Sequence, residues 1–428
     1  MDASSRREFM AQTAMAGAGL LLGVSPATAR AYPANDKLSI GVIGVANRGR
    51  ANLDGVASEH IAALCDVDET YLAACAKDYP QAALYTDFRK MIDKGGLDAV
   101  VVSTADHTHA PAAALALQAD LDVYCEKPLA HNVAEVRKLT DLARRRKRIT
   151  QMGTQIHAES NYRRVVEAVQ SGAIGEVREV HVWCGGGPAP AERPKDRPPV
   201  PESLHWDLWL GPAPYRPYHP AYVPFQWRWW WDFGNGTLGD MACHHMDLPF
   251  WALNLRVPET IEADGPPVHP ERCPQWLVVR YAFGSRGSLP PVTLTWYHGD
   301  RRPPYFTEGS LPEWGNGTLF VGSKGMLLAD YSKHVLLPER RFRDWSPPPR
   351  SIPDSIGHHA EWIAGCKTRT SALCDFSYAG PLTEAVLLGN VAYRSGKTLR
   401  WDSAHMRLPG NEDAERYLRR RYRRGWRL

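Results

Sequence analysis

The sequence predicts an α/β protein whose first half is built on a parallel, doubly wound sheet. Short apolar runs alternate with amphipathic stretches from Lys37 to Gly153, a glycine-containing turn follows the first run, and after Ser171 the pattern changes to apolar–polar alternation. The first two features are typical of β-α repeats, and the third is typical of strands with one exposed face. With 428 residues and 44% hydrophobic composition, the chain is long enough for two domains.

Residues 1–31 have the features of a twin-arginine export signal. Arg6 and Arg7 precede an Ala/Gly-rich apolar stretch at 11–24, and overlapping Ala-x-Ala sites end at Ala29 and Ala31. We therefore expect a signal peptide over 1–31 and a periplasmic or otherwise exported protein. A frayed N-terminal helix is the alternative. No later run reaches the ~18 apolar residues of a membrane span, so we expect no membrane contact after signal cleavage.

Charge and cysteine spacing argue against two classes of partner. The formal net charge is only +4, and the basic residues are scattered except at 144–148 and from Arg416 onward. We therefore expect no nucleic-acid partner. The eight cysteines show neither a C-x-x-C pair nor metal-like spacing, so we expect no structural zinc and predict no disulfide.

The β-α alternation places the elements of the first half. We expect strands at residues 38–44, 61–66, 99–103, 122–125 and 149–153. We expect the intervening helices at residues 49–58, 69–77, 109–119 and 133–146. Strands and helices that alternate in this way form a parallel sheet covered by helices on both faces.

The turn after the first expected strand is a variant of the dinucleotide-binding fingerprint. Residues 44–49 read G-V-A-N-R-G, so alanine stands where a second glycine normally lets the backbone approach the pyrophosphate. A strand precedes the turn, and a helix follows whose N-terminal amides can bind phosphate. An α/β domain that binds no nucleotide is the alternative. The cofactor residues expected in this turn are Gly44, Ala46, Asn47, Arg48 and Gly49.

The end of the next expected strand favours NAD over NADP. Asp66 stands there, where a carboxylate accepts hydrogen bonds from the adenosine ribose hydroxyls and repels a 2′-phosphate. Arg48 and Arg50 leave NADP as the less favoured alternative, because either arginine is able to pair with a 2′-phosphate.

Four motifs in order carry a resemblance to a known family. They are Gly41-Val-Ile-Gly44 with Gly49, Cys65-Asp-Val-Asp68, Ser103-Thr-Ala-Asp-His-Thr-His109 and Glu126-Lys-Pro-Leu-Ala130. Together they resemble the glucose–fructose oxidoreductase / inositol dehydrogenase (Gfo/Idh/MocA) family, over nearly all of the chain after the signal. Ala46 is the one clear departure in the cofactor site.

The resemblance implies a Rossmann domain at 37–155 and a larger α+β domain at 156–428, whose open, mostly antiparallel sheet covers the nicotinamide. That sheet often forms the subunit interface in the family, so a homo-oligomer (dimer or tetramer) is expected. The residue pattern agrees: we expect a helix at 160–171 and strands at 177–183, 276–282, 292–297 and 318–321. Helical periodicity returns at 355–367 and 381–394, followed by a strand at 397–401, and the C-terminal segment should pack on the Rossmann domain.

Two separate clusters supply the candidate chemistry. Lys127 follows an expected strand at the sheet edge where ligands bind, and Pro128 is expected to fix the turn that presents it, with a cis bond as one means. The second cluster is an expected helix that runs to about Leu253. On it Asp240, His244 and Asp247 lie at i, i+4 and i+7, on one side, with His245 about 100° away.

The resemblance implies that Lys127, Asp240 and His244 surround the substrate. Oxidising an alcohol with NAD requires a base that takes the hydroxyl proton as the hydride leaves. We assign His244 as the proton acceptor, Lys127 as the positive group that polarises the hydroxyl, and Asp240 as the residue that orients them or the sugar; an exchange of these roles is compatible with the sequence. Adjacent histidines have the wrong spacing for two metal ligands on one face, so no metal is expected.

Further residues complete the expected site. Thr104, His107, Glu126 and Lys127 are expected near the cofactor, and Gln155, His157, Trp230 and His245 near the substrate. The tryptophans and tyrosines between 205 and 231 are interpreted as a sugar-facing lid, with packing beneath a loop as the alternative.

The favoured function is an NAD(P)-dependent oxidoreductase acting on a CH–OH group of a sugar or cyclitol, with tightly held cofactor. Its alternative is a redox-neutral, NAD-dependent glycosidase resembling glycoside hydrolase family 109. A non-catalytic sugar-binding protein is the third hypothesis.

Overall fold

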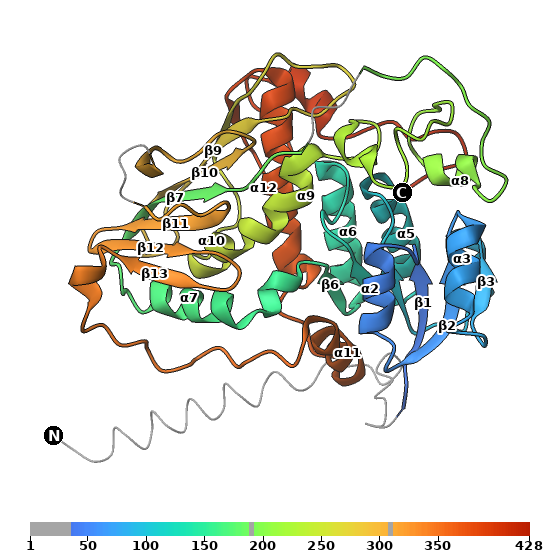
Figure 1. Cartoon of the computed structure of the whole chain (residues 1–428), viewed down its shortest axis with the longest axis horizontal. Coiled ribbons are helices and arrows are strands. Elements are labelled where there is room, and N and C mark those ends of the chain that lie inside the picture. Colours follow the sequence, from blue (N-terminus) through green and yellow to red (C-terminus); the bar gives the residue numbers. More distant parts are fainter. Residues whose placement is uncertain (1–35, 188–191, 307–310) are drawn as a thin grey trace.

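The computed structural model describes residues 36–187, 192–306 and 311–428, and in it two sheets lie side by side with helices packed around them (Figure 1). The first sheet is six-stranded, parallel, with the order β3-β2-β1-β4-β5-β6. The second is eight-stranded and mostly antiparallel, with the order β13-β12-β11-β7-β10-β9-β8-β14. The predicted fold class is confirmed. The predicted export signal at 1–31 lies outside the described residues.

The first sheet forms because its strands are apolar and buried on both faces. All residues of β4 (Ala99–Val102) are buried, as are those of β5 (Asp122–Cys125). The remaining strands are β1 (Ser39–Ile43), β2 (His60–Cys65), β3 (Ala83–Tyr85) and β6 (Thr150–Met152). The helices are α2 (Arg48–Gly55), α3 (Glu69–Ala76), α4 (Phe88–Lys94), α5 (Asp106–Gln118) and α6 (Val133–Arg146).

The strand order fixes where a ligand binds. The chain winds from β1 through β2 to β3, then returns to the other side of β1 to add β4, β5 and β6. The crevice at the carboxyl ends of the strands opens between β1 and β4, where the direction of winding reverses. The elements β3 and α4 were missed from the sequence, because β3 has only three residues and two of them are exposed.

The second sheet begins with β7 (Val177–Trp183), which pairs parallel with β10 (Val292–His298) and antiparallel with β11 (Gly317–Gly322). Along β9 (Leu277–Phe283), buried and more exposed residues alternate, as the sequence predicted. The other strands are β8 (Thr260–Asp264), β12 (Gly325–Ala329), β13 (His334–Leu337) and β14 (Leu399–Arg400).

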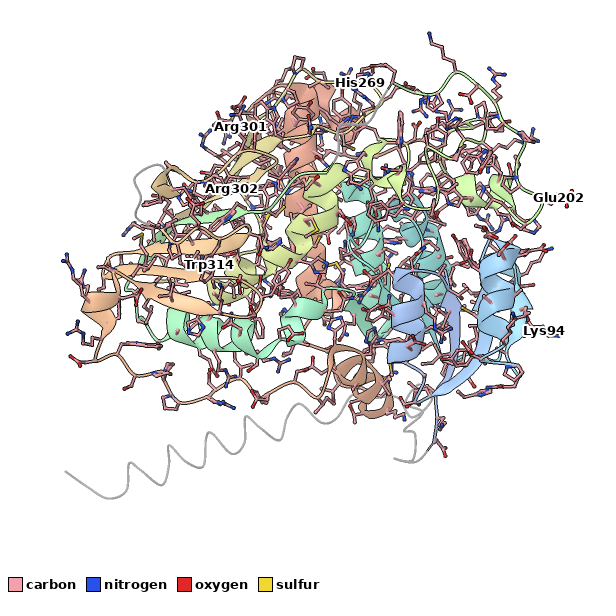
Figure 2. All side chains as sticks on the ribbon, viewed as in Figure 1. Lys94, Glu202, His269, Arg301, Arg302 and Trp314 are labelled. Atoms are coloured by element: carbon pink, nitrogen blue, oxygen red, sulfur yellow. The ribbon has the colours of Figure 1, made fainter. Side chains whose placement is uncertain are left out.

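Six further helices follow the first domain in the described part of the chain. They are α7 (Ser160–Gln170), α8 (Trp206–Leu210), α9 (Gly236–His245), α10 (Asp247–Ala252), α11 (His358–Thr368) and α12 (Phe376–Ser395). Helix α8 lies beside the first domain (Figure 1), and α11 contacts α2. Short 3-10 turns are η1 (Gln155–Ala158), η2 (Gln226–Trp229), η3 (Pro304–Phe306), η4 (Glu339–Phe342) and η5 (Glu412–Tyr417). In Figure 2 side chains fill the space between the ribbons, while the exposed Lys94 and Glu202 lie at the periphery.

The expected single helix running to Leu253 is wrong, because it breaks at Met246 into α9 and α10. Pro249 explains the break: its ring has no N–H, and in a continuous helix it would clash with the carbonyl of His245. The freed His245 carbonyl accepts a hydrogen bond from Thr318 Oγ1 at 3.3 Å. Asp247 does not line the cavity that holds Asp240 and His244; it is bonded instead to His157 Nδ1 at 2.9 Å and to Tyr378 Oη at 2.7 Å.

An ion pair fastens α6 to α12 and so joins the two sheets. Glu384 is 3% exposed and is paired with Arg137; its Oε1 accepts from Arg137 Nη2 at 2.7 Å and from Trp401 Nε1 at 2.9 Å. A buried carboxylate needs such partners, since an uncompensated buried charge is costly.

Within the described residues, no helix is both long and apolar enough to cross a membrane. All eight cysteines have free thiols, and all are buried.

We predict that Glu384→Ala lowers the free energy of unfolding by roughly 3 kcal/mol, because it leaves Arg137 without its buried partner. Urea denaturation of the purified protein measures the change. The control is Glu176→Ala, which breaks an exposed pair with Arg178 whose side chains are 61% and 63% exposed and should cost less than about 1 kcal/mol. Equal losses in the two variants would contradict the role given to Glu384.

Candidate active site

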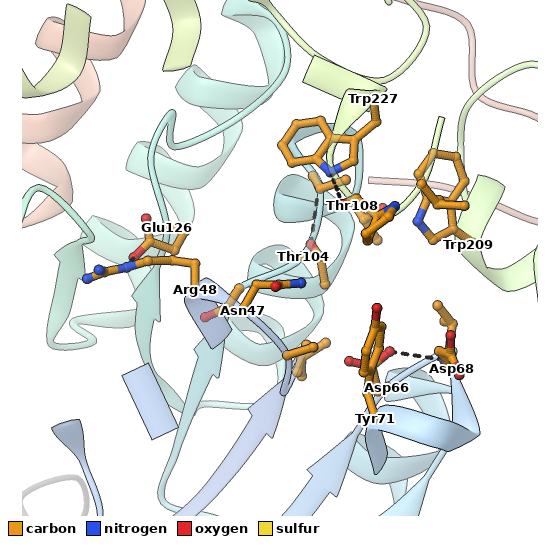
Figure 3. Close-up of a pocket in the computed structure, with 18 of the residues that line it drawn as sticks. Asn47, Arg48, Asp66, Asp68, Tyr71, Thr104, Thr108, Glu126, Trp209 and Trp227 are labelled. Atoms are coloured by element: carbon orange, nitrogen blue, oxygen red, sulfur yellow. Dashed lines mark hydrogen bonds and ion pairs between the residues drawn. The ribbon is translucent and has the colours of Figure 1, made fainter. Parts of the chain in front are cut away.

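A cavity of ≈ 750 Å³ lies at the carboxyl ends of the strands of the first sheet (Figure 3). Its opposite wall is formed by α9 and by the segment that leads from Pro201 to Arg228. Eleven of the predicted site residues line it: Gly44, Ala46, Asn47, Arg48, Asp66, Thr104, Glu126, Lys127, Gln155, Asp240 and His244. The topology therefore brings together residues that follow five strands of the first sheet and residues from one helix of the second domain.

The turn between β1 and α2 has the shape that a pyrophosphate requires. Gly44 has φ +82°, and a Cβ there would lie 2.7 Å from the Ser103 carbonyl oxygen. A Cβ on Gly49 would lie 2.0 Å from the Gly44 carbonyl oxygen, so neither position tolerates a side chain. Gly49 itself packs behind the cavity wall, while Ala46 and Asn47 line the cavity. The turn and the helix behind it fit a dinucleotide phosphate.

Asp66 marks the adenosine end of the cavity. It accepts hydrogen bonds from the backbone N–H of Val45 at 2.9 Å and of Asp68 at 3.0 Å. Burial raises the pKa of Asp66, although these backbone donors oppose the effect. The carboxyl group thus keeps a fixed place at the end of β2, next to the lining residues Asp68 and Tyr71 (Figure 3).

Arg48 and Arg50, the two arginines that kept NADP as an alternative cofactor in the sequence analysis, form ion pairs with other carboxylates. Arg50 binds Asp54 at 2.8 Å and Asp78 at 2.6 Å. Arg48 binds Glu126 at 3.1 Å, toward the other end of the cavity. Neither guanidinium is bonded to Asp66 or to its neighbours, so the geometry favours a ribose hydroxyl over a 2′-phosphate beside Asp66.

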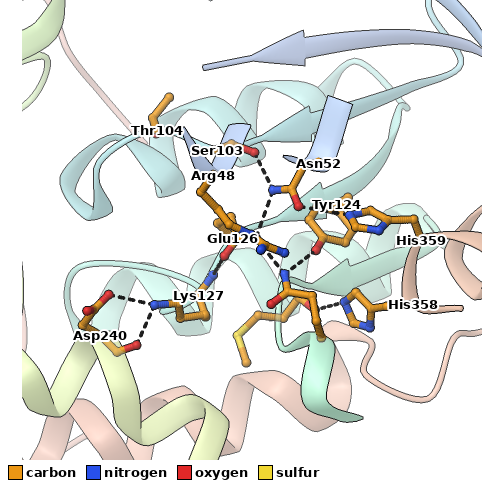
Figure 4. A network of polar contacts seen from close by, with 12 residues as sticks. Arg48, Asn52, Ser103, Thr104, Tyr124, Glu126, Lys127, Asp240, His358 and His359 are labelled. Atoms are coloured by element: carbon orange, nitrogen blue, oxygen red, sulfur yellow. Dashed lines mark hydrogen bonds and ion pairs between the residues drawn. The ribbon is translucent and has the colours of Figure 1, made fainter. Parts of the chain in front are cut away.

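Glu126 organises the end of the cavity nearest Lys127 (Figure 4). Its Oε1 accepts from Arg48 Nε at 3.1 Å, Asn52 Nδ2 at 2.9 Å and Gln155 Nε2 at 2.9 Å. Three side-chain donors thus converge on one oxygen of this buried carboxylate. Gln155 was predicted to contact substrate, but its amide N–H groups are used by Glu126 and by Tyr124 Oη at 2.9 Å.

Lys127 and Asp240 form the centre of the site. Lys127 Nζ donates to Asp240 Oδ1 at 2.8 Å and to the Asp240 carbonyl oxygen at 2.6 Å. The lysine follows β5 and precedes Pro128 in a cis peptide bond, whereas Asp240 comes from α9. The pair therefore joins the edge of the first sheet to a helix of the second domain.

Arg228 is a second cation on the same carboxylate, and the sequence reasoning missed it. Its Nε lies 3.2 Å from Asp240 Oδ1, and its guanidinium carbon lies 4.2 Å from the ring centre of Phe225 and 4.3 Å from that of Trp227. Burial raises the pKa of Asp240, but the charges of Lys127 and Arg228 outweigh it and lower the value to about 2. Asp240 is therefore an anion at any physiological pH.

His244 is suited to accept a proton. It lines the cavity one helical turn after Asp240, and its Nδ1 has no hydrogen-bond partner among the described residues. Burial, followed by the charge of Lys127, lowers the pKa of His244 well below its usual value. The imidazole is therefore neutral and able to accept a proton, and its lowered pKa makes it a weaker base than a free imidazole.

Asp106 is another lining residue that the sequence reasoning passed over, although it stands within the 103–109 motif. It is 4% exposed, and its Oδ2 accepts a hydrogen bond from Asn235 Nδ2 at 3.3 Å. Burial, and then the charge of Asp240, raise the pKa of Asp106 to about 7. An acidic residue after a parallel strand is the signal that would have identified it.

His107 does not line the cavity, so its predicted contact with the cofactor is wrong. It is fully buried, and its Nδ1 and Nε2 face the carbonyl oxygens of Phe233 at 3.2 Å and Trp209 at 2.9 Å. It therefore connects α5 to the aromatic segment, residues 205–233, on the other side of the cavity.

Three of the four predicted substrate residues also lie away from the cavity. His157 binds Asp247 at 2.9 Å and stacks on Trp251 at 4.0 Å. His245 faces Tyr331 Oη at 2.8 Å, and Trp230 is 3% exposed. All three side chains are buried inside the second domain.

Both interpretations given from the sequence, a sugar-facing lid and packing beneath a loop, apply to parts of the aromatic segment. Trp209, Tyr218, Phe225 and Trp227 line the cavity, whereas Trp206, Tyr222, Trp230 and Phe233 are buried against one another in a small core. No group of three or more His, Cys, Asp or Glu side chains in the described part of the chain is arranged to hold a metal ion.

Two family models match the chain. One, described as "Oxidoreductase family, NAD-binding Rossmann fold", matches residues 38–154, and the other, described as "Oxidoreductase family, C-terminal alpha/beta domain", matches residues 183–294. The first domain is thus an NAD-binding Rossmann fold.

Curated relatives include an inositol 2-dehydrogenase of Salmonella typhimurium, 27% identical over 150 residues, which are 34% of this chain and 45% of that protein. The match thus spans about half the length of that relative. A myo-inositol 2-dehydrogenase of Thermotoga maritima is 28% identical over 303 residues, 68% of this chain and 75% of that protein. Among solved structures, the WlbA dehydrogenase of Bordetella pertussis in complex with NADH and UDP-GlcNAcA has the same fold, with a TM-score of 0.64, 15% identity, and coverage of 86% of this chain and 99% of that one.

We predict that Asp66→Asn shifts the ratio of NADPH to NADH affinity toward NADPH by about tenfold, because it removes the charge that repels a 2′-phosphate. Fluorescence titration with each cofactor measures both dissociation constants. Asp54→Asn, on the exposed partner of Arg50, should leave the ratio unchanged. An unchanged ratio in the Asp66 variant would refute the placement of the ribose.

We predict that Asp106→Asn stabilises the protein increasingly as the pH rises from 4 to 7. The folded-state pKa of about 7 lies above the ordinary aspartate value of 3.8, so the folded protein keeps a proton that the unfolded chain releases in this window, and wild-type stability falls. The gain should reach on the order of 2–4 kcal/mol by pH 7. Thermal unfolding from pH 4 to 8 tests it; a difference between variant and wild type that stays constant with pH would contradict it.

Proposed function

Because the chain belongs to the Gfo/Idh/MocA oxidoreductase family, we propose that it transfers a hydride between NAD and a CH–OH group of a sugar or cyclitol. The observation that carries the proposal is the grouping of Lys127, Asp240 and His244 in one cavity with the dinucleotide turn. The inositol dehydrogenases among its relatives support the substrate class.

The cofactor would be held by residues already placed. The turn from Gly44 to Arg48 would receive the pyrophosphate, and Asp66 the adenosine ribose. The nicotinamide end then falls near Thr104 and Lys127, which line the opposite part of the cavity. When bound, NAD supplies a ring that accepts or returns a hydride.

The hydrogen bonds of Lys127 suggest how the roles are divided. An ammonium group has three donors, and Asp240 uses two of them. The third donor would stabilise the negative charge that develops on the substrate oxygen. His244, a neutral imidazole that lines the cavity, would take the hydroxyl proton, and Asp240 would hold the lysine and accept from a neighbouring hydroxyl.

The N-terminal sequence supports a proposal about location. The twin-arginine pattern in 1–31 would export the chain, and we propose a periplasmic or otherwise exported enzyme that keeps its NAD bound and recycles it within each turnover. Free NAD is scarce outside the cytoplasm, which makes exchange with solution hard to sustain. A homo-oligomer, dimer or tetramer, built on the second sheet is part of the same proposal.

Asp106 favours a second candidate, the redox-neutral glycosidase. Oxidation of a sugar at C3 acidifies the proton on C2; a base removes that proton, the aglycone leaves, water adds, and return of the hydride restores the alcohol. Such a cycle needs a second acid–base group besides His244. The buried carboxyl of Asp106, with its pKa raised by burial to about 7, lies in the same cavity.

We predict that His244→Asn lowers kcat by about 10²–10⁴-fold, while the dissociation constant of NADH stays within about threefold. Its control is His245→Asn, one position on and turned away from the cavity, which should keep most of the activity. Lys127→Met should lower kcat similarly and leave Asp240 paired with Arg228. The measurement is NADH absorbance with a panel of sugars and cyclitols.

The same proteins separate the candidate functions. Incubation with aryl glycosides and no added NAD releases the phenol only if the glycosidase cycle operates, and net NADH appears only in the dehydrogenase. If sugars bind to the protein but neither assay shows turnover, the result would support the third hypothesis, a non-catalytic sugar-binding protein. Full activity in the Lys127 variant would overturn the site assignment.

A further inference from the structure

The last residues of the chain reach the cavity. Trp426 lines its adenosine end, where its ring lies 5.9 Å from that of Phe88 at the start of α4. The guanidinium of Arg89 lies 4.4 Å from the Trp426 ring centre on the same side. Phe88 follows β3, the neighbour of the strand that ends at Asp66. The indole therefore lies beside the place that the base attached to the ribose would occupy.

The segment that carries Trp426 is fastened to the first domain. Arg420 Nε binds Glu135 Oε1 at 2.8 Å, and Tyr422 Oη donates to the same oxygen at 2.7 Å. Glu135 is 2% exposed and lies in the first turn of α6. The backbone of α6 is also bound, because Ala134 N–H donates to the Leu418 carbonyl oxygen at 2.9 Å.

The same segment is fastened to the opposite wall of the cavity. Arg423 is ion-paired with Asp207 in α8, and its Nη2 donates to the Asp207 carbonyl oxygen at 2.7 Å. Its Nε donates to the Gly211 carbonyl oxygen at 3.1 Å, and its backbone N–H donates to that of Pro212 at 3.1 Å. Figure 1 shows the C-terminus beside α8. Residues 419–428, the C-terminal tail, thus connect the two walls between which a dinucleotide would enter.

A second segment, residues 203–205 just before α8, crosses the same end of the cavity and is called the strap below. The chain before α8 crosses the β2–α3 turn, where Glu69 N–H donates to the Ser203 carbonyl oxygen at 2.9 Å and His205 N–H donates to that of Val67 at 2.8 Å. Arg423 holds α8, and α8 continues directly from this strap. Opening the adenosine end therefore requires the tail to leave Asp207 as well.

We propose that residues 419–428 form a cofactor clamp, in which Trp426 stacks on the adenine of NAD and Arg423 locks the segment over it. Indole faces bind the π-face of a base. The clamp slows both entry and release, so the enzyme keeps its NAD through many turnovers. The inference rests on the NAD site alone, and it stands or falls independently of which sugar reaction the protein performs.

Cofactor exchange in the full-length protein tests the clamp, with no measurement of activity. The dissociation constant of NADH is measured by fluorescence titration, and its release rate by displacement with excess NAD⁺. Trp426→Ala should raise both by about tenfold or more, and Trp426→Phe should restore most of the loss. Values within twofold of wild type for Trp426→Ala would overturn the stacking role.

Arg423→Ala separates the lock from the stacking contact. It should raise the association and release rates together, about tenfold each, with a nearly unchanged dissociation constant, because it frees the tail without removing the indole. The control is Arg424→Ala, its exposed neighbour, which should leave both rates as in wild type. Rates for Arg423→Ala equal to those of the control would overturn the lock. Should Trp426→Ala fail to fold, Trp426→Leu takes its place, because it keeps apolar bulk but removes the aromatic face, and it should raise the dissociation constant and the release rate in the same way.

Discussion

The ion pair between Lys127 and Asp240 is the contact on which the rest of the site depends. The two residues lie 113 positions apart and in different domains, and they meet because the turn after β5 faces α9. Helix α9 also carries His244, and the residue before it, Asn235, donates to Asp106. One charge pair across the domain boundary therefore sets where the base, the cation and the second carboxyl stand relative to one another.

The three carboxyl groups around this pair show how partners decide charge in a buried site. Glu126 has three side-chain donors, and Asp240 has two cations. Asp106 has a single amide and a negative neighbour, so burial dominates and its pKa rises. Similar side chains in one cavity thus reach different protonation states, which is the arrangement that acid–base chemistry at neutral pH requires.

Much of this was predictable where local chemistry decides the outcome. The bounds of α6 match the expected helix, because Asn132 caps it and accepts from Glu135 N–H at 3.1 Å, and the strands of the first sheet are apolar runs between turns. Prediction failed where residues that are distant in the sequence determine the surroundings of a side chain. Nothing near His107 in the sequence reveals that two carbonyls from the aromatic segment will occupy its ring, and Arg228 and Trp426 reach the cavity along paths that only the tertiary fold defines. Pro249 is different, because its effect on the helix was legible in the sequence and was overlooked.

The buried thiols have a consequence for how the protein meets its surroundings. All eight cysteines are buried in the folded chain and none forms a disulfide, so an oxidant in solution finds no thiol on the surface. The redox potential of a compartment can act on these cysteines only through chains that are not yet folded, or that have opened. Oxidation of these cysteines is therefore governed by the folding equilibrium of the protein. The interactions that stabilise the folded chain also keep its thiols reduced.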